Sequence, residues 1–516
     1  MVAYLKRLVS SLAAYQVADV VSKLIAIPLL ALYTRYIGTS GYGVLELLAN
    51  GVILISILVR LGMIEAFLRF YFSDEDQERR DGLARRASGF LVLTTTIAAV
   101  VLAAAAPPLS KLVLGSHDAG IFRIAVLGLW AFTNLELAYA LLRVDERLRT
   151  YATASLVNVL MTISGSVVLV VALRLGPRGL LLANYGASTL VLLALWWTMR
   201  RRLFGHLRPS LRGRRRHGAD RRWLGAAKGS GGLIRPESLS ALLRFGLPTV
   251  PAEASVYALS LIDRYYIYHQ RGAGLAGVYS IAVKLAGAVA FIVRAFQYAW
   301  PPLAYSVTDD AQAARLYGLV TTYYLLISGW VVAGLALLGR WVLRLLTTHQ
   351  FLGAYRALPW VALGWAMYGL WVVFLVIAGR AKVTKRNFPA SLAGLVANLV
   401  LIVLLVPPLG IAGAGVALCG AYTVMLAVMH FLTRRAFTVA FEWRRLSQLV
   451  LVIGGVTVGG DLLLPTHGTV GLLTRVAAFL AIPLALVLTR FAHPAELRSA
   501  GALIGRLRGE RAGGKV

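Results

Sequence analysis

The chain has 516 residues, of which 59% are hydrophobic and 15% are charged, and its formal net charge is +31. The mean hydropathy of +0.73 excludes a soluble globular protein and indicates an integral membrane protein. In a soluble chain such a charge would favour a nucleic-acid partner, but here the basic residues flank apolar segments, so we expect none. The single cysteine, Cys419, excludes a disulfide framework and a cysteine-based metal site, and we expect neither a metal nor a cofactor.

The apolar residues form fourteen segments, each near the length of about 20 residues that a helix needs to cross the hydrocarbon. Because the strands of a β-barrel would alternate apolar and polar residues, we predict an all-α polytopic membrane protein. The basic N-terminus and its apolar run continue to Tyr33, which predicts a retained helix rather than a cleaved signal peptide. The predicted spans lie near 11–34, 43–64, 88–107, 120–142, 152–173, 178–199, 241–262, 275–299, 317–339, 354–378, 388–407, 411–432, 446–464 and 468–490.

The distribution of basic residues predicts the orientation. An even number of spans places both termini on one side, and most of the 53 Lys and Arg residues fall at span ends on that side. The positive-inside rule makes that side the cytoplasm. The longest loop, 200–240, includes the stretch RRRLFGHLRPSLRGRRRHGADRRW. We interpret it as a joint whose arginines hold the topology and contact phospholipid headgroups, because it lacks the aromatic residues of a nucleic-acid reader.

The two halves of the chain are related by a shift of 234 positions. The shift places spans seven to twelve over spans one to six and predicts two pseudo-symmetric six-helix lobes inserted in the same orientation. We therefore predict lobes at 1–199 and 241–435, separated by the basic loop 200–240 and followed by two further helices at 436–490 and a basic tail at 491–516. The matched residues are Asp19 and Glu253, Gly38 and Gly272, Gly43 and Gly277, Val59-Arg60 and Val293-Arg294, Tyr71 and Tyr305, Gly176 and Gly410, Gly179 and Gly413, and Gly186 and Gly420.

The stretch GAGLAG at 272–277 has the spacing of a dinucleotide-binding loop, but a membrane span rather than a strand precedes it. Its shifted partner, GTSGYG at 38–43, occupies the same external turn. We therefore predict a turn that uses the backbone freedom of glycine. The chain has no HExxH, GxSxG or P-loop pattern and no long external loop, so we do not expect an enzyme.

Four cations fall inside predicted spans, namely Lys23, Arg60, Lys284 and Arg294. Each would cost about 2.5–3.5 kcal/mol at the centre of a helix that faces lipid. They must face a wet cavity, pair with acids or extend to the interface. Lys284 lies about 15 Å along its helix, where extension to the interface is hardest, so we favour a cavity. Arg60 and Arg294 lie nearer the cytoplasmic boundary, and for them extension to the interface stays open.

The first helix carries a polar stripe at Gln16, Asp19 and Lys23. Asp19 and Lys23 are four residues apart and can pair, which would only stabilise the lobe. Alternatively, Lys23 binds a substrate phosphate, while Asp19 and Glu253 take part in proton or cation coupling.

Two stretches resemble a known family. The first is PLLALYTRYIGTSGYGVLELL at 28–48. It is similar to the turn between the first and second helices of bacterial oligosaccharide flippases, the Wzx-type polysaccharide transporters of the multidrug/oligosaccharidyl-lipid/polysaccharide (MOP) superfamily. FGLPTVPAEASVYALSLIDRYYIYHQRGAGLAGVYSIAVKLA at 245–286 resembles their seventh and eighth helices. The residues that carry this second resemblance are Pro248, Pro251, Asp263-Arg264, Gly277, Tyr279, Ser280 and Lys284.

The resemblance implies two lobes around a cavity that opens alternately to each side of the bacterial inner membrane. It implies a substrate of the undecaprenyl-pyrophosphate-linked oligosaccharide type, moved from the cytoplasmic to the outer leaflet, with membrane lipids, a polysaccharide polymerase and assembly proteins as partners. By analogy with the related lipid II flippases, in which the last two helices form a groove for the lipid tail, we expect helices 13 and 14 to hold the lipid tail. A diphosphate requires cations, which we assign to Lys284, Arg60, Arg294 and Lys23. Asn50, Asn134 and Tyr257 are candidates for glycan contacts.

Three alternatives stay open at this stage. A lipid II flippase shares these features, and a multidrug exporter of the same superfamily is disfavoured only because such exporters have acidic cavities, whereas cations outnumber acids among the candidates here. A membrane-embedded polysaccharide polymerase or ligase is the alternative from a different class.

Overall fold

A computed structural model of the chain describes residues 29–71, 76–204, 238–307 and 309–491. These residues form helices and turns with no strand, as predicted. Twelve of the described helices are long and apolar enough to cross a membrane, and a thirteenth candidate is interrupted, Leu239–Leu259 followed by Leu261–Arg271. The predicted first span, 11–34, lies largely outside the described residues, and the interrupted helix corresponds to the predicted seventh span. The other twelve predicted spans are confirmed.

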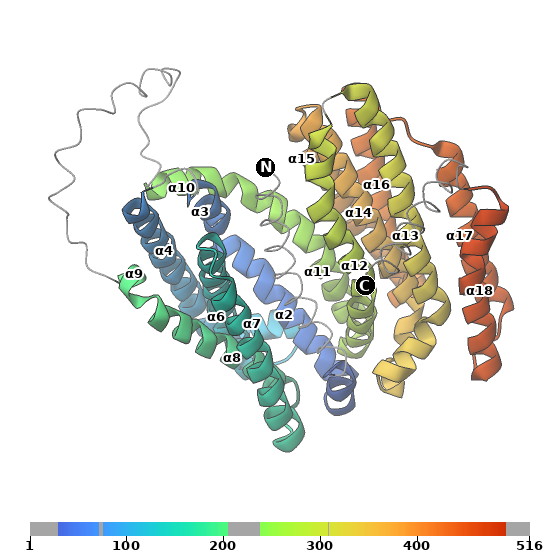
Figure 1. Cartoon of the computed structure of the whole chain (residues 1–516). Coiled ribbons are helices and arrows are strands. Elements are labelled where there is room, and N and C mark those ends of the chain that lie inside the picture. Colours follow the sequence, from blue (N-terminus) through green and yellow to red (C-terminus); the bar gives the residue numbers. More distant parts are fainter. Residues whose placement is uncertain (1–28, 72–75, 205–237, 308, 492–516) are drawn as a thin grey trace, which may run out of the picture. The chain divides into compact units, whose positions relative to one another are not determined.

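The chain divides into two compact units, 1–261 and 262–516. In the first unit, α6 is buried along most of its length and contacts α2, α4, α7 and α8, so it forms the centre of the packing. Side chains from α3, α4, α6 and α8 share a core that includes Phe67, Leu91, Leu141 and Leu192. The helices of this unit are α2 (Thr39–Val59), α3 (Met63–Tyr71), α4 (Gln77–Ala104), α5 (Ala106–Leu114), α6 (Ala119–Val144), α7 (Leu148–Ser166), η1 (Val167–Ala172), α8 (Gly176–Thr198), α9 (Arg200–Phe204), α10 (Leu239–Gly246) and the start of α11 (Val250–Arg271) (Figure 1).

In the second unit, α12, α14 and α16 are the most buried helices, while α13 contacts both α17 and α18. Arg475 of α18 is 3% exposed, and it donates to Asp461 at 3.2 Å and to the carbonyl of Pro465 at 3.1 Å, which fixes the turn between α17 and α18. The helices are the end of α11, α12 (Ala273–Ser306), α13 (Asp310–Leu346), η5 (His349–Arg356), α14 (Leu358–Arg380), η6 (Thr384–Arg386), α15 (Asn387–Leu409), α16 (Ile411–Thr433), α17 (Trp443–Leu463) and α18 (Gly468–Leu488).

The turns of the two halves repeat each other, which supports the predicted duplication. Gly38 precedes α2 with φ 52° and ψ 168°, and Gly272 precedes α12 with φ 87° and ψ 162°. Gly176, the first residue of α8, and Gly410, which precedes α16, have φ 56° and 60°. These positive φ values favour glycine, so Gly272 forms the predicted turn, while residues 273–277 already belong to the start of α12.

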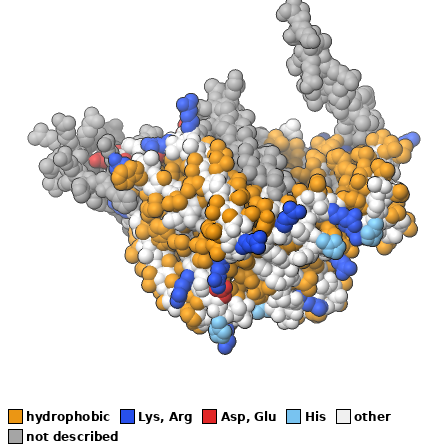
Figure 2. Space-filling model, turned by 90° about the horizontal axis from the view of Figure 1, so that it is seen from below, with side chains coloured by type: hydrophobic (Ala, Val, Ile, Leu, Met, Phe, Trp, Pro, Cys, Tyr) orange, Lys and Arg blue, Asp and Glu red, His pale blue; other side chains and the backbone are white. Residues whose placement is uncertain are grey.

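The outer faces of several helices expose apolar side chains, as expected for contact with lipid. Figure 2 shows hydrophobic side chains over much of the visible surface, with separate Lys and Arg side chains between them. The exposed apolar residues include Leu93, Ile97, Val100 and Val101 of α4, Val396, Val400 and Leu404 of α15, and Val450, Leu451 and Val458 of α17.

Within the first unit, the backbone after α2 lies directly against the end of α10. A Cβ on Gly62 would lie 2.1 Å from the carbonyl oxygen of Gly246, and a Cβ on Gly246 would lie 2.4 Å from the carbonyl oxygen of Gly62. Gly62 also has φ +69°, a backbone angle that residues with a side chain rarely adopt. Only glycine therefore allows this approach, which brings the segment leading into α11 close to the end of α2.

We predict that Gly62→Ala destabilises the protein, because it adds about 1–3 kcal/mol of backbone strain as well as a clash with Gly246. The measurement is the melting temperature of the purified protein in detergent. The matched control is Gly51→Ala, which lies in α2 with nothing within 4 Å of the added Cβ and should keep or raise stability. Equal melting temperatures for the two variants would contradict the prediction.

Candidate functional site

Arg60 lies where α2 ends, and its backbone N–H donates to the carbonyl of Ser56. The next residues, Leu61 and Gly62, have φ 49° and 69° and turn the chain into α3. The Arg60 side chain is 9% exposed, so its charge is removed from bulk water. A guanidinium in this position needs partners inside the protein.

Three carboxylates surround this guanidinium. Arg60 Nη1 donates to Glu136 Oε2 of α6 at 2.9 Å, and Nη2 donates to Glu253 Oε1 of α11. Glu65 Oε1 of α3 lies 3.5 Å from Nη2. We call Arg60, Glu65, Glu136 and Glu253 the Arg60 cluster. The contacts come from four helices of one unit, so the cluster is a tertiary feature.

The Arg60 cluster contains more negative than positive groups, with one guanidinium and three carboxyl groups. The carboxylates are 34–36% exposed at their side chains, which leaves them accessible to water. Within the described part of the chain, Arg60 Nε and Glu65 Oε2 are buried and form no hydrogen bond. An anionic ligand that binds Arg60 must therefore compete with carboxylates that already hold its nitrogens.

The structure also brings together Asn50 and Tyr257, two of the candidate glycan contacts. The Tyr257 hydroxyl donates to Asn50 Oδ1 at 2.9 Å, and Asn50 Nδ2 donates to the backbone oxygen of Glu46 at 2.7 Å. Glu46 itself is 6% exposed. This gives a second polar group along α2, N-terminal to Arg60.

Asn134, the third candidate for glycan contact, lies in the packed interior of the first unit. It is 3% exposed, and its Nδ2 donates to Thr95 Oγ1 at 2.9 Å and to the carbonyl of Trp130 at 2.8 Å. A glycan would have to displace this packing to reach it, so its assigned role stays a prediction without geometric support.

In the second unit, Lys284 and Arg294 lie on α12 and are both exposed. They are ten residues apart, or about 15 Å along the helix. Their roles stay predictions. Lys23 and Asp19 lie outside the described residues.

Sequence reasoning missed Glu65, Glu136 and Glu46 because it ranked cations within spans and not acids. Glu136 stands in the middle of an apolar span, which is a signal of the same kind as Arg60. Its pairing with Arg60 across 76 residues was not visible from local spacing.

Comparison with known proteins identifies the family. The model of the polysaccharide biosynthesis protein family matches residues 8–304, more than half of the chain. The chain belongs to this family. No curated relative matches its sequence.

Solved structures show the same fold as this polysaccharide biosynthesis protein. The lipid II flippase MurJ in an inward closed conformation matches with a TM-score of 0.69 and 14% identity over 92% of this chain and 98% of that chain. An inward-facing multidrug resistance MATE family transporter of the MOP superfamily matches with a TM-score of 0.59 and 14% identity over 84% and 94%. A mutant of the Vibrio cholerae MATE transporter VcmN matches with a TM-score of 0.52 and 14% identity over 83% and 93%.

The family member described here is thus a multi-pass membrane protein whose fold is shared with solved transporters of the MOP superfamily. The predicted fold class and family resemblance are confirmed.

We predict that Arg60→Gln lowers stability much more than Arg294→Gln, because it leaves Glu65, Glu136 and Glu253 without their buried counterion. The loss should be about 3 kcal/mol. Thermal unfolding in detergent measures it. Adding Glu136→Gln should restore part of the loss, since one fewer carboxylate is left unpaired. The interpretation fails if Arg60→Gln and Arg294→Gln melt at the same temperature.

Proposed function

We propose that the protein is a flippase that moves an oligosaccharide linked to a polyprenyl pyrophosphate of the undecaprenyl type from the cytoplasmic to the outer leaflet of the bacterial inner membrane by alternating access. Family membership and the MurJ-like fold over 92% of the chain support a lipid-linked substrate. The single observation that carries the proposal is Arg60, a guanidinium at the end of a membrane span that is held by the partly exposed carboxylates of Glu136 and Glu253.

The Arg60 cluster explains how the positive charge of Arg60 is compensated when no substrate is bound. A pyrophosphate carries about two negative charges and can bind a guanidinium through two parallel hydrogen bonds, as a carboxylate does. In the resting protein Glu136 and Glu253 occupy those positions. The substrate replaces them at Arg60, and the released carboxylates then take up protons or a cation, because neighbouring carboxylates without their shared counterion repel one another. Glu253 thereby couples substrate binding to ion binding, as proposed for it together with Asp19.

Lys284 and Arg294 supply the cations of the second lobe, and Lys23 supplies another on the first helix. Exposure of Lys284 and Arg294 on α12 is consistent with contact to a ligand. Lys284 acts as a compact point charge, whereas Arg294 offers a bidentate contact. Asn50 and Tyr257, already joined by a hydrogen bond, are the proposed contacts for sugar hydroxyls. Both termini face the cytoplasm in this proposal.

We predict that Lys284→Ala reduces transport of the lipid-linked oligosaccharide at least about tenfold, because a charge-assisted hydrogen bond contributes about 1.5–3 kcal/mol. Purified protein in liposomes with labelled lipid-linked oligosaccharide in one leaflet provides the measurement. Lys284→Arg should retain part of the activity. The matched control, Lys385→Ala, removes an exposed lysine of η6 and should leave transport unchanged.

The same assay tests the class of activity. A flippase moves the labelled lipid between leaflets with its mass unchanged, whereas a polymerase or ligase changes the mass. Transport at the wild-type rate by a correctly folded Lys284→Ala variant would overturn the role of Lys284 in the site.

A second candidate function has one observation in its favour. The structure places three carboxylates around Arg60, and Glu46 lies on α2 N-terminal to Arg60. The described interior of the first unit therefore holds more acidic residues than we expected from the sequence, where cations outnumber acids among the candidate residues. An acidic site suits an exporter of cationic compounds. Efflux of ethidium from cells that express the protein, abolished by Glu136→Gln, together with no movement of lipid-linked sugar, would favour that function instead.

A further inference from the structure

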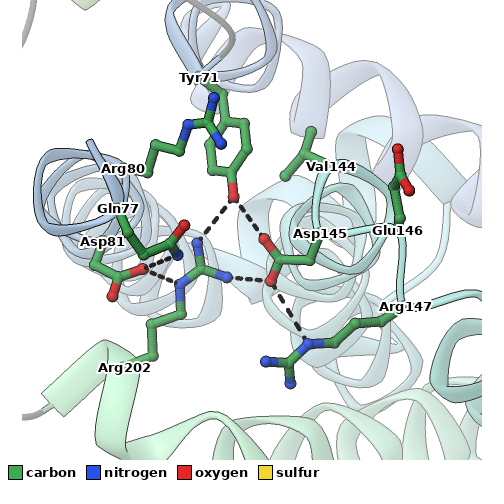
Figure 3. A pocket seen from close by; sticks show the side chains of 9 residues that line it. All are labelled: Tyr71, Gln77, Arg80, Asp81, Val144, Asp145, Glu146, Arg147 and Arg202. Atoms are coloured by element: carbon green, nitrogen blue, oxygen red, sulfur yellow. Dashed lines mark hydrogen bonds and ion pairs between the residues drawn. The ribbon is translucent and has the colours of Figure 1, made fainter. Parts of the chain in front are cut away.

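A polar pocket of about 680 Å3 lies in the first unit, at helix ends outside the Arg60 cluster (Figure 3). It is formed where α3 ends, where α4 begins, at the turn from α6 to α7, and by α9. Except for Val144, every lining side chain carries a polar or charged group. The lining residues are Tyr71, Gln77, Arg80, Asp81, Val144, Asp145, Glu146, Arg147 and Arg202.

The floor of the pocket is built around Arg202. Its Nε donates to Asp81 Oδ1 at 2.6 Å, and its Nη1 donates to Asp145 Oδ2. The Tyr71 hydroxyl donates to Asp145 Oδ1 at 2.6 Å. Burial raises the pKa of Tyr71, and the hydrogen bond to Asp145 raises it further, so the hydroxyl keeps its proton. Figure 3 shows these groups converging on the Arg202 guanidinium.

The residues at the rim of the pocket are more exposed to solvent than those at its floor. Gln77, Glu146 and Arg147 are exposed. Arg147 Nε lies 3.9 Å from Asp145 Oδ2, which is at the limit of an ion pair, and Gln77 Nε2 donates to Asp81 Oδ1 at 3.2 Å. The lining holds three guanidinium groups and three carboxylates, so its formal charge is zero.

The second unit builds the same turn with a different set of charges, because there Arg380 at the end of α14 donates to Asp310 of α13 at 2.7 Å. Asp145 ends α6 with φ −81° and ψ 0°, and Ala381 ends α14 with φ −72° and ψ −2°. The next residues, Glu146 and Lys382, have φ 55° and 56°. Arg147 then corresponds to Val383.

The other charged positions change in the same way. Asp76 and Asp309 each accept a backbone N–H in the first turn of the next helix, α4 or α13, which aligns the two helix starts. In that alignment Arg80 and Asp81 correspond to Ala313 and Ala314, and under the 234-residue shift Arg202 corresponds to Ala436. Glu146 corresponds to the charged Lys382, whereas the residues that bind Arg202 and Arg202 itself are replaced by apolar residues or by Tyr305. The Arg202 network is therefore particular to the first unit.

The chemistry of the lining selects a polyhydroxyl ligand. A diphosphate would gain from Arg80 and Arg147 but would also meet the carboxylates of Asp81, Asp145 and Glu146, and the pocket has no net charge to attract it. Sugar hydroxyls both donate and accept hydrogen bonds. They match a rim in which Glu146 accepts, Arg147 donates and the Gln77 amide can do both. The lining residues lie at helix ends, where a hydrophilic glycan can reach them without entering the hydrocarbon.

We infer that this pocket is a glycan subsite that holds the sugar portion of the lipid-linked substrate at the membrane surface, apart from the Arg60 cluster. The inference rests on the proposed function, because it assumes a substrate that carries an oligosaccharide. It assigns sugar contacts to Glu146, Arg147 and Gln77, and it leaves Arg202 and its partners as the supporting floor.

Binding of a water-soluble probe tests the subsite directly. The probe is the oligosaccharide released by mild acid from the lipid-linked pool of the host cell, and its affinity for the full-length protein in detergent is measured by calorimetry. The combined variant Glu146→Gln, Arg147→Gln should bind at least about fivefold more weakly, since one hydrogen bond contributes about 1 kcal/mol. Both side chains are exposed, so the melting temperature should not change.

The matched control is Glu78→Gln combined with Arg149→Gln, which makes the same chemical changes at exposed positions outside the pocket and should bind like the wild type. Equal affinity of the pocket variant and this control, no binding to the wild-type protein, or displacement of the probe by inorganic pyrophosphate would each overturn the glycan subsite.

Transport assays distinguish this failure from a failure of the proposed function. In liposomes, the pocket variant should raise the half-saturating concentration for the lipid-linked oligosaccharide about fivefold and leave transport of the same carrier bearing one sugar unchanged. Equal effects on both substrates would contradict the subsite while leaving the flippase function intact. If wild-type protein moves neither lipid, the proposed function fails, and binding of the soluble probe still decides the subsite.

Discussion

A charged side chain in or beside the hydrocarbon must find its compensating groups within the protein, because lipid offers none. Arg60 is the residue at which this constraint organises the first unit. Its guanidinium holds side chains from α3, α6 and α11 against the end of α2. The close approach of Gly62 and Gly246 next to it permits this convergence, since any larger residue would separate the two backbones. Packing and charge compensation therefore depend on the same turn.

This arrangement bears on the proposed transport of an anionic lipid. A carrier that releases an anion on the far side of the membrane must compensate the charge of its cationic side chains both when the substrate is bound and when the site is empty. Carboxylates that occupy the guanidinium in the empty state perform that task, and they also provide groups on which an exchanged ion can bind. In this view the acids of the Arg60 cluster and the cations proposed for substrate binding are parts of one mechanism, in a protein of the polysaccharide biosynthesis family with a MOP transporter fold.

The two halves share backbone geometry more closely than they share side chains. The glycines that start α2 and α12, and the left-handed residues Glu146 and Lys382, repeat from one half to the other. The same turn nevertheless carries different side chains in the two units, with Arg202 bound to Asp81 and Asp145 in the first and Arg380 bound to Asp310 in the second. Capping and turn geometry depend on a few backbone angles, so the remaining side chains at these helix ends can differ between the two halves.

The sequence by itself determined the class of the protein, because the length of an apolar helix, the bias of Lys and Arg, and a 234-residue repeat are properties of local segments. It also located Arg60 as an unusual residue. The tertiary structure alone decided its partners, since Glu136 and Glu253 are 76 and 193 residues away and helical periodicity does not say which helices face each other. The same holds for the pocket, which Tyr71, Asp145 and Arg202 form only after three separate helix ends meet.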